Sequence, residues 1–365
     1  MAMTAPVDVV VLLGSRWSSL ERVTTRWQQV VRRWAARPDV GRLTVVDFPV
    51  FRPGTATCAP APSWLPDVDA LSLLVPLPRR PRLPIDRWGW RAAATALRRA
   101  LPTEATPVVV ASTPLWCPLL PHLPWRTGFD GYDDWRVLPS VAAVRGRVDA
   151  GYRCAARAGS VSAVSVELRD RLQADYGLRS DVVPNGADTA RMRAGGPAPE
   201  GLPDSEFAVY VGVVEDRVDL DLLARTRTVM PVVVAGPVQP ATGEHLRAAG
   251  VTCLGQVDPA LVPGLLSRAS VALVPHLRNP LTASMDPMKL YDYRAAGLPV
   301  VATDVAGTTV PGVRVSEPDE WESAVRNAAA APREHHSVRD WDDVADELFA
   351  AHVAEQRLAV ARRGA

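Results

Sequence analysis

Two series of short valine-rich runs, each followed by amphipathic helical patterns, constrain the fold of this chain more than any other feature. The runs of the first series are "VDVVVLLG", "RLTVVDFP", "PVVVAS" and "AGSVSAVS". Apolar residues at helical spacing from Leu20 to Trp34 predict the first helix. Ser165 and Gly177 are placed to begin and end another. Strands that alternate with helices are typical of βαβ units, so we expect an α/β fold with parallel sheets.

The pattern restarts after "RAGGPAPEGLPDSE", a stretch of turn-forming residues that predicts a domain boundary. The runs beyond it are "FAVYVGV", "PVVVAGP", "VTCLGQV", "VALVPH" and "LPVVATDV". We therefore expect two Rossmann-like domains that face a cleft, over residues 1–183 and 184–345. The last predicted helix, from about Trp341 to Arg363, is long enough for residues 346–365 to cross back to the N-terminal domain.

Composition and charge argue against several classes of protein. The net charge of +1 gives no support for nucleic-acid binding, which is typical of a strongly basic domain. The four cysteines have no C-x-x-C spacing, so we expect reduced thiols and no zinc site. The N-terminal apolar run is too short to span a membrane and has no basic flank or cleavage site. No other run approaches ~20 apolar residues, so we expect a cytoplasmic protein.

Residues 59–94, "APAPSWLPDVDALSLLVPLPRRPRLPIDRWGWRAAA", depart from the pattern. Proline disfavours the interiors of helices and sheets, so we expect an extended loop that ends in a helix near Trp90. The tryptophans could pack this loop onto the protein. Trp and Arg together would equally suit an amphipathic ligand or a membrane interface. Nine of the eleven tryptophans precede residue 136, which favours the N-terminal domain for a bulky, partly apolar ligand.

The stretch "DPMKLYDYRAAGLPVVAT" joins a short polar helix to a strand-like run. Asp286 is placed to cap this helix, and Pro287 suits its first turn. Lys289 and Asp292 lie three residues apart on one face, so they either form a surface ion pair or hold a ligand. As ligand groups, Lys289 supplies a charge for phosphate, and Asp292 can accept two hydrogen bonds from a ribose diol.

Other polar groups follow predicted strands, where a doubly wound sheet binds ligands. Thr282 and Ser284 could donate hydrogen bonds to the same ligand. Gly14, after the first strand, permits a ligand to approach the backbone. Arg217, in "GVVEDRVD", could contact a diphosphate, and an exposed loop arginine is the alternative.

Three carboxylates, Asp130, Asp133 and Asp134, cluster in "GFDGYDDW". Clustered carboxylates raise one another's pKa, which suits a general base. An acidic turn whose aspartates cap helices is the alternative.

Taken in order, these stretches resemble glycosyltransferases of the GT-B fold, the class with two Rossmann-like domains that uses nucleotide sugars. "VYVGVVEDRVDLDLL" resembles the opening of the donor domain, and "VALVPHLRN" the strand and loop near the base and sugar. "DPMKLYDYRAAGLPVVAT" is similar to the Pro-x-Lys-x-x-Glu-Tyr stretch of many members. "FDGYDDW" resembles the Tyr-Asp-x-x-Asp-Asp run of envelope-polysaccharide members.

The resemblance implies that the N-terminal domain binds the acceptor and the C-terminal domain a nucleotide-sugar donor. Asp292 takes the place of a ribose-binding Glu, Lys289 that of a diphosphate contact, and Gly14 lies in the N-terminal loop near the donor phosphate. The candidate donor-binding residues are Gly14, Arg217, His276, Thr282, Ser284, Met288, Lys289 and Asp292.

Two positions depart from the retaining members of this class. Their motif has a Glu eight residues before the ribose-binding residue, where this chain has Ser284, and their Arg after the domain-opening glycine is Val213 here. We therefore expect an inverting, metal-independent hexosyl transfer without a cofactor, in which Asp130 or Asp134 deprotonates the acceptor hydroxyl. The acceptor is polysaccharide, lipid-linked or a secondary metabolite, and a peripheral contact with the inner face of the membrane is left open.

Two alternatives share the architecture. A hydrolysing nucleotide-sugar epimerase needs acidic and histidine side chains against the sugar, and His276 is the one well-placed histidine. A non-catalytic, two-domain nucleotide-binding protein is the other alternative. Such proteins are normally exported, and no signal peptide is visible.

Overall fold

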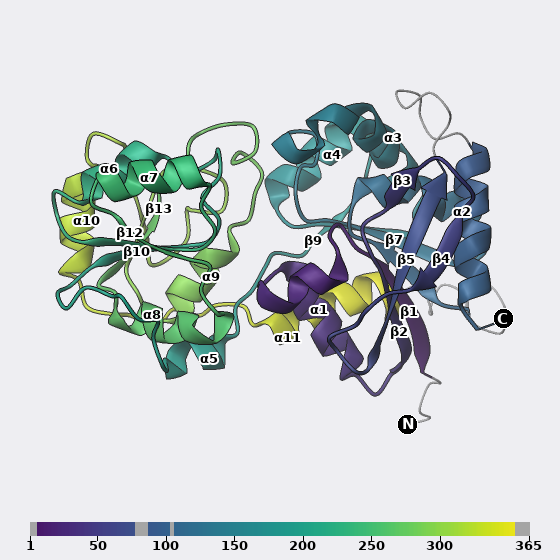
Figure 1. Cartoon of the computed structure of the whole chain (residues 1–365), viewed down its shortest axis with the longest axis horizontal. Helices are drawn as coiled ribbons and strands as arrows, with labels where there is room; N and C mark the ends of the chain where they lie inside the picture. Colours follow the sequence, from purple (N-terminus) through teal and green to yellow (C-terminus); the bar gives the residue numbers. More distant parts are fainter. Residues whose placement is uncertain (1–5, 77–86, 103–105, 355–365) are drawn as a thin grey trace. The chain divides into compact units, whose positions relative to one another are not determined.

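The chain folds into two α/β units in the computed structural model, which describes residues 6–76, 87–102 and 106–354 (Figure 1). Unit 1 contains Met1–Pro184 and Val344–Ala365, and unit 2 contains Asn185–Asp343. The sequence predicts boundaries after residues 183 and 345. Each unit is built around a mainly parallel sheet, which confirms the predicted α/β class with two Rossmann-like domains.

The described sheet of unit 1 is parallel along the path β3-β5-β2-β1-β6-β7-β8-β9, and β4 pairs antiparallel with β5. Its strands are β1 (Val7–Leu12), β2 (Val40–Val46), β3 (Val50–Arg52), β4 (Thr57–Pro60), β5 (Val68–Pro76), β6 (Val108–Ala111), β7 (Arg126–Gly131), β8 (Ser160–Ala163) and β9 (Asp181–Val182). β1 and β6 are neighbours where the strand order reverses, so the loops after them leave at the switch point of this sheet.

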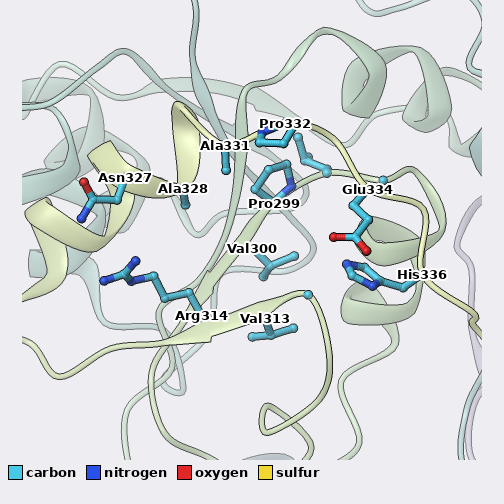
Figure 2. A pocket seen from close by; sticks show the side chains of 13 residues that line it. Pro299, Val300, Val313, Arg314, Asn327, Ala328, Ala331, Pro332, Glu334 and His336 are labelled. Atoms are coloured by element: carbon cyan, nitrogen blue, oxygen red, sulfur yellow. The ribbon is translucent and has the colours of Figure 1, made fainter.

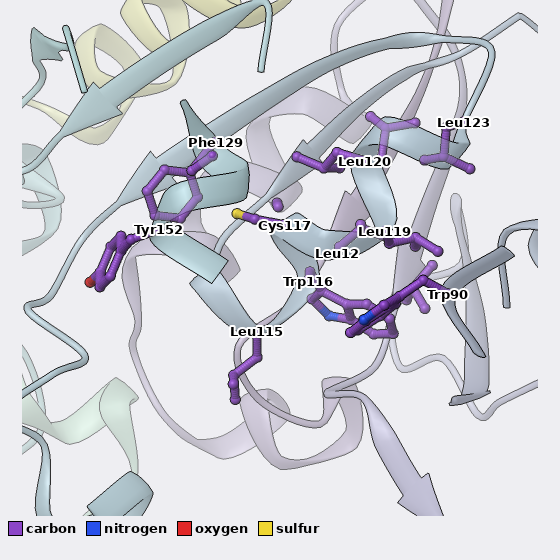
Figure 3. Close-up of a cluster of buried hydrophobic side chains, with 14 of the residues drawn as sticks. Leu12, Trp90, Leu115, Trp116, Cys117, Leu119, Leu120, Leu123, Phe129 and Tyr152 are labelled. Carbon is purple, nitrogen blue, oxygen red and sulfur yellow. The ribbon is translucent and has the colours of Figure 1, made fainter. Parts of the chain in front are cut away.

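The helical segments of unit 1 bury one aromatic-rich core against its sheet. They are the 3-10 turns Trp17–Arg22, Pro114–His122 and Pro139–Val144, and the helices α1 (Arg26–Ala35), α2 (Arg87–Ala100), α3 (Arg145–Ala155) and α4 (Val166–Tyr176). Figure 3 shows part of this core, with Trp90 from α2 beside Trp116 and Tyr152 from α3 beside Phe129. The ring centroids of Trp90 and Trp116 are 6.5 Å apart.

α4 begins and ends where the sequence predicts. The Ser165 hydroxyl accepts a hydrogen bond from the backbone N–H of Leu168, as an N-cap should. Gly177 ends the helix with φ of 69°, a left-handed conformation that glycine adopts readily. The predicted first helix is shorter than expected, because the Thr25 hydroxyl caps a new start at Arg26 and the preceding residues form the 3-10 turn.

The prediction of an extended loop over residues 59–94 is wrong for part of that range. β5 runs inside the sheet between β2 and β3, and its only proline is its last residue, Pro76. Proline outside the ladder does not interrupt strand pairing, so the neighbouring prolines masked a real strand. The helix expected near Trp90 is confirmed as α2. Residues 77–86 lie outside the described residues.

The described sheet of unit 2 is parallel, in the order β12-β11-β10-β13-β14-β15. Its strands are β10 (Ala208–Val211), β11 (Val232–Ala235), β12 (Thr252–Gly255), β13 (Val271–Val274), β14 (Val300–Ala302) and β15 (Val313–Val315). This is the doubly wound order 3-2-1-4-5-6, with its switch point between β10 and β13. All five strands predicted for this half of the chain are present.

Helices cover both faces of the unit 2 sheet, so its strands are apolar on both sides. These helices are α5 (Thr189–Ala194), α6 (Leu220–Thr226), α7 (Pro240–Ala248), α8 (Val262–Arg268), α9 (Met288–Ala295) and α10 (Trp321–Ala329), with a 3-10 turn at Pro259–Leu261. Val209 and Leu290 of α9 belong to the core on one face, and Tyr210 and Trp321 of α10 to the core on the other.

The chain returns to unit 1 through α11 (Trp341–Phe349) and a π-helical turn (Ala350–Ala354). The Trp34 indole donates a hydrogen bond to the backbone carbonyl of Ala345 at 2.9 Å. The buried His352 ring contacts the hydroxyls of Ser160 and Ser162 at 2.8 and 2.9 Å. Its burial lowers the pKa of His352 to about 4.

The predicted continuation of the last helix to Arg363 lies outside the described residues. Among the helices that are described, none has the length and apolar character needed to cross a membrane.

Candidate functional site

The loops after β10 and β13 leave the unit 2 sheet at its switch point, and backbone contacts tie them together. The N–H of Leu277 donates a hydrogen bond to the carbonyl of Arg217 at 2.8 Å. A β-bridge joins Val218 to His276. These contacts fix Arg217 and His276 next to each other at the carboxyl edge of the sheet, where doubly wound folds bind ligands.

His276 has a clamped backbone and an unpaired ring. Its N–H donates to the Thr303 hydroxyl at 3.0 Å, and that hydroxyl donates to the His276 carbonyl at 2.6 Å. The residue is 2% exposed, yet neither ring nitrogen has a hydrogen-bond partner among the described residues. Burial, together with the charges of Lys289 and Arg217, lowers the pKa of His276 well below 6.5. Because buried polar groups are normally paired, this neutral imidazole is a candidate ligand-binding group.

Lys289, the second residue of α9, points at the end of β10. Its Nζ lies 3.9 Å from the centroid of the Tyr210 ring, a cation–π contact. A Cβ on Gly212 would come within 3.2 Å of this Nζ, so only glycine leaves the ammonium this much room. Burial lowers the pKa of Lys289 well below 10.5; the charge of Arg217 acts in the same direction and that of Glu215 opposes it.

Arg217 completes a group of three basic side chains that share a single nearby acid. Its guanidinium lies 3.3 Å from the Glu215 carboxylate, which is about half exposed. The Nε of Arg217 is buried and has no hydrogen-bond partner in the part of the chain that the structure describes. Arg217, His276 and Lys289, the basic cluster, therefore combine positive charge with unused donors, which suits a phosphate or diphosphate.

The surface ion pair that the sequence left open between Lys289 and Asp292 is absent from the described structure. Asp292 lies one turn further along α9 and is near Asp188 and Arg191 of the α5 region, whose charges act on it in opposite directions. Burial, the largest effect, raises the pKa of Asp292 to about 7. A carboxylate that forms no ion pair with a described residue can accept hydrogen bonds from hydroxyl groups.

α9 begins one residue later than the sequence suggested, and Asp286 is not its cap. Pro287 occupies the N-cap position, which has no side-chain hydrogen bond. Asp286 instead accepts hydrogen bonds from the backbone N–H of Asn185 at 2.6 Å and from the Tyr291 hydroxyl at 2.8 Å. The prediction that Asp286 caps the helix is therefore wrong.

The remaining donor candidates in this unit differ in how available they are. The Thr282 hydroxyl donates to the Leu277 carbonyl at 2.7 Å and accepts from the Asn279 N–H at 3.0 Å, so its hydrogen bonds hold the loop. Ser284 is 1% exposed. Met288 is the first residue of α9 and is half-buried. The structure brings Arg217, His276 and Lys289 together and gives Thr282 a structural role in the loop.

Gly14 follows β1 at the switch point of unit 1, and its surroundings are filled by side chains. Its N–H donates to the Ser112 hydroxyl at 2.9 Å. A Cβ on Gly14 would lie 2.5 Å from the Tyr132 hydroxyl and 3.0 Å from the Trp135 ring. The glycine thus permits a close approach, and the groups that approach are two aromatic side chains of the "GFDGYDDW" stretch.

Asp130 lies within β7 and is fully buried. It forms an ion pair with Arg26 at 2.9 Å and accepts a hydrogen bond from the Ser162 hydroxyl at 2.6 Å. This hydroxyl also contacts the His352 ring, so Asp130 belongs to a network that fixes the C-terminal segment. A carboxylate with these partners is a structural ion in this conformation, and the geometry does not favour it as the base.

Asp134 is held in the same manner by a different arginine. Its two oxygens accept hydrogen bonds from Nε and Nη2 of Arg136 at 2.7 and 2.6 Å, and Arg171 lies 3.7 Å away. The expected single cluster of aspartates is therefore divided into two arginine-neutralised sites. The sequence-based alternative of a structural acidic turn fits Asp134 better than a catalytic role.

An open hollow in unit 2 lies away from all of these residues. Figure 2 shows it at the amino ends of β14 and β15, with Val300 and Val313 at its floor and Arg314 and His336 at its sides. Ligands of doubly wound sheets bind at the carboxyl ends of the strands. This hollow is therefore not the equivalent of the basic cluster.

Tyr210 and Glu215 are site residues that the sequence analysis missed. Tyr210 carries the cation–π contact, and its hydroxyl donates to the Val213 carbonyl at 3.0 Å, which shapes the loop after β10. The available signal was a polar aromatic residue near the end of the apolar run "FAVYVGV".

Parts of this chain are similar to known proteins. Residues 215–330, which include the whole basic cluster and Asp292, match the family described as Glycosyl transferases group 1. A 66-residue segment is 33% identical to a protein named as a teichuronic acid biosynthesis glycosyltransferase, TuaH of Bacillus subtilis. That match covers 18% of this chain and 17% of TuaH, so only about a sixth of that relative's length is represented.

Solved structures match over nearly the whole chain. The α,α-trehalose 6-phosphate synthase of Burkholderia multivorans has a TM-score of 0.64 at 12% identity, over 98% of this chain and 100% of that one. HepE of Anabaena, solved in complex with UDP and glucose, has a TM-score of 0.61 at 15% identity, over 98% and 100% of the two chains. At these identities the likeness establishes a shared fold.

Proposed function

We propose that this chain, which has the fold of these two-domain proteins and a group 1 glycosyltransferase match over residues 215–330, is a glycosyltransferase. It transfers a hexose from a nucleoside-diphosphate sugar to an acceptor hydroxyl, and no metal takes part. The observation that carries the proposal is the basic cluster at the switch point of unit 2, in which three basic side chains face one partly exposed acid.

The donor is assigned to unit 2 by the chemistry of its groups. Lys289 and Arg217 contact the diphosphate, and the neutral His276 ring donates its N–H to a phosphate or sugar oxygen. Asp292 accepts hydrogen bonds from the ribose diol. Val213 lies in the loop after β10 and Leu277 in the loop after β13. They are 39% and 41% exposed, so an apolar nucleobase face can cover them.

The same groups assist bond cleavage. As the glycosidic bond breaks, negative charge grows on the leaving diphosphate. The basic cluster therefore stabilises the transition state more than the ground state. The cluster is fixed by the backbone contacts of its loops before the donor arrives, so little reorganisation accompanies the reaction.

We propose that transfer inverts the anomeric centre, because Ser284 occupies the position where retaining relatives have a Glu. Slow hydrolysis of the donor by water gives a test that needs no acceptor. Proton NMR at early times should show release of the anomer opposite to that of the donor; release of the same anomer would contradict inversion.

The family resemblance assigns the base to Asp130 or Asp134, each of which is held by an arginine in this conformation. We assign the acceptor to unit 1, as a polysaccharide, lipid-linked or secondary-metabolite hydroxyl, and place the enzyme in the cytoplasm. Nothing in the composition favours a nucleic-acid partner.

Titration calorimetry with UDP, GDP and dTDP tests the donor assignment directly. We expect one of these nucleotides to bind the wild-type chain and to raise its melting temperature. Absence of binding by all three, together with no thermal shift from the corresponding nucleotide sugars, would refute the proposal.

A hydrolysing nucleotide-sugar epimerase remains the second candidate, because His276 lies in the candidate donor site with its ring unpaired. Such an enzyme would epimerise UDP-N-acetylglucosamine without any acceptor. Proton NMR of the protein incubated with UDP-N-acetylglucosamine distinguishes the transferase from the epimerase. We expect slow hydrolysis of the nucleotide sugar without epimerisation. Appearance of the epimer would favour the epimerase. A binding protein would leave the donor intact.

A further inference from the structure

α2 presents a line of arginines on its exposed side. Arg87, Arg91 and Arg98 recur at helical spacing, so they lie along one stripe, and Arg99 extends it on the adjacent stripe. All four are exposed. The opposite side of the helix, with Trp90, is buried in the core of unit 1. The helix therefore has one apolar face that is buried in the core and one cationic face that is exposed among the described residues.

These charges have no internal counter-ions in the described structure. No acidic residue occurs between Arg87 and Ala100, and none of the four arginines forms an ion pair with a described residue. Nearby, burial and the charges of Arg91 and Arg87 lower the pKa of His122, so the positive potential extends beyond the helix. Because the whole chain has a net charge of only +1, this is a local concentration of charge.

An exposed tryptophan lies beside the arginines. Trp88 is 64% exposed, whereas Trp90, two residues later, is 5% exposed and packs against Phe51 and Trp116. Figure 1 shows α2 along the outside of the unit 1 sheet. A large apolar side chain left in water beside four cations indicates a surface that meets something else.

We propose that the exposed face of α2 docks unit 1 onto a bilayer surface that contains anionic phospholipids. Guanidinium groups pair with lipid phosphates, and each basic residue near such a surface adds about 1 kcal/mol to binding. The Trp88 indole suits the headgroup region, where one part of the ring is apolar and its N–H is hydrated. A nucleic acid would match the arginines, but a single exposed aromatic ring on a straight helix does not provide a stacking groove.

The surface is separate from the basic cluster of unit 2, so the inference does not depend on the proposed function. For residues 59–94 the sequence left two alternatives, a loop packed onto the protein or an interface with an amphipathic ligand or a membrane. For α2, the proposal favours the membrane interface. It also gives a physical reason for a lipid-linked acceptor to be met at a membrane.

Co-sedimentation of the full chain with vesicles tests the proposal. At low salt we expect binding to vesicles of phosphatidylcholine with a third phosphatidylglycerol, little binding to phosphatidylcholine alone, and release by salt. The double variant R91Q/R98Q should bind the anionic vesicles about 25-fold more weakly, which is about fivefold for each charge. W88A should weaken binding several-fold and leave its salt dependence unchanged.

A matched control removes two exposed arginines elsewhere. Arg157, after α3, and Arg268, at the end of α8, are exposed and form no ion pair with a described residue. R157Q/R268Q should bind like the wild type, with all variants checked for equal far-UV circular dichroism and melting temperature. Failure of the wild type to bind anionic vesicles, or equal binding by R91Q/R98Q and the control, overturns the proposal.

Discussion

The carboxyl edges of the two sheets are built alike but treat charge in opposite ways. In unit 1 the carboxylates of Asp130 and Asp134 are each neutralised by an arginine. In unit 2, Lys289 and His276 are partly or fully buried and form no ion pair with a described residue, and Arg217 has one partly exposed partner. A neutralised edge contributes to stability, whereas an edge with unmatched charge is prepared for a ligand at some expense of stability.

The largest effect is expected from removing the buried Asp130–Arg26 ion pair of unit 1. Asp130→Asn leaves Arg26 buried without its counter-ion, and loss of one partner of a buried pair lowers the free energy of unfolding by about 3–5 kcal/mol. Urea unfolding measures it. Asp69→Asn is the control, because Asp69 and Arg42 form a pair on the same sheet with both side chains about half exposed, and its loss should change stability by under about 1 kcal/mol.

If Asp130 were the base and not a structural ion, Asp130→Asn would retain full stability and lose only transfer. That result would overturn the structural role that its contacts indicate.

A second substitution tests the unpaired cation at the carboxyl edge of the unit 2 sheet. Lys289→Met removes a desolvated cation without opening a cavity, so the ligand-free protein should be as stable as the wild type or more stable. Loss of one charged contact to phosphate should weaken nucleoside-diphosphate binding by about 10- to 100-fold. Calorimetry and thermal melts measure the two effects.

The control for Lys289→Met is Arg314→Met, which removes an exposed cation at the other edge of the same sheet. It should leave the affinity unchanged. Equal affinity of Lys289→Met and the wild type would remove Lys289 from the site.

The unmatched charge also predicts proton uptake on binding. The pKa of His276 lies well below 6.5 in the free site, and a bound diphosphate raises it by supplying negative charge. A pKa that rises on binding means that protons are taken up, so affinity should increase as the pH falls through the range of His276 titration. Calorimetry in buffers of different ionisation enthalpy should report uptake of a fraction of a proton at pH 6, and His276→Ala should reduce it.

Asp292 should give the smallest effect and the opposite pH dependence. Its pKa is about 7, so the carboxylate that accepts hydrogen bonds from a ribose is present above this pH and lost below it. Asp292→Asn should weaken nucleotide binding several-fold at pH 8 and almost not at pH 5.5. An equal loss of nucleotide affinity at pH 8 and pH 5.5 would exclude the ionised Asp292 carboxylate as a hydrogen-bond acceptor for the ribose.

The sequence predicted the parts of the fold that depend on local pattern. The two Rossmann-like domains are confirmed, as is the resemblance to GT-B glycosyltransferases. The hydroxyl of Ser165 and the φ of Gly177 define the ends of α4 as expected. β5 was missed because prolines on either side of it obscured an uninterrupted apolar strand. Asp286 was misassigned because its true partner, Asn185, is 101 residues away in sequence.

The site required tertiary information for the same reason. Spacing alone could not show that Asp130 and Asp134 have different arginine partners, because the arginine that neutralises Asp130 is 104 residues away in sequence. The sequence also left an ion pair between Lys289 and Asp292 open. What distinguishes Lys289 is the Tyr210 ring beneath it and the absence of a Cβ at Gly212, contacts that only the folded sheet creates.

Lys289 has one more consequence, which concerns chemical labelling. The chain contains 41 lysine and arginine residues, and Lys289 is its only lysine. Its lowered pKa increases the fraction of free, nucleophilic ε-amine at a given pH. Reductive methylation with ¹³C-formaldehyde should label this position and the α-amino group alone. The resulting dimethyl resonance, shifted by the Tyr210 ring current, is a single NMR signal for the protonation state and nucleotide occupancy of the site.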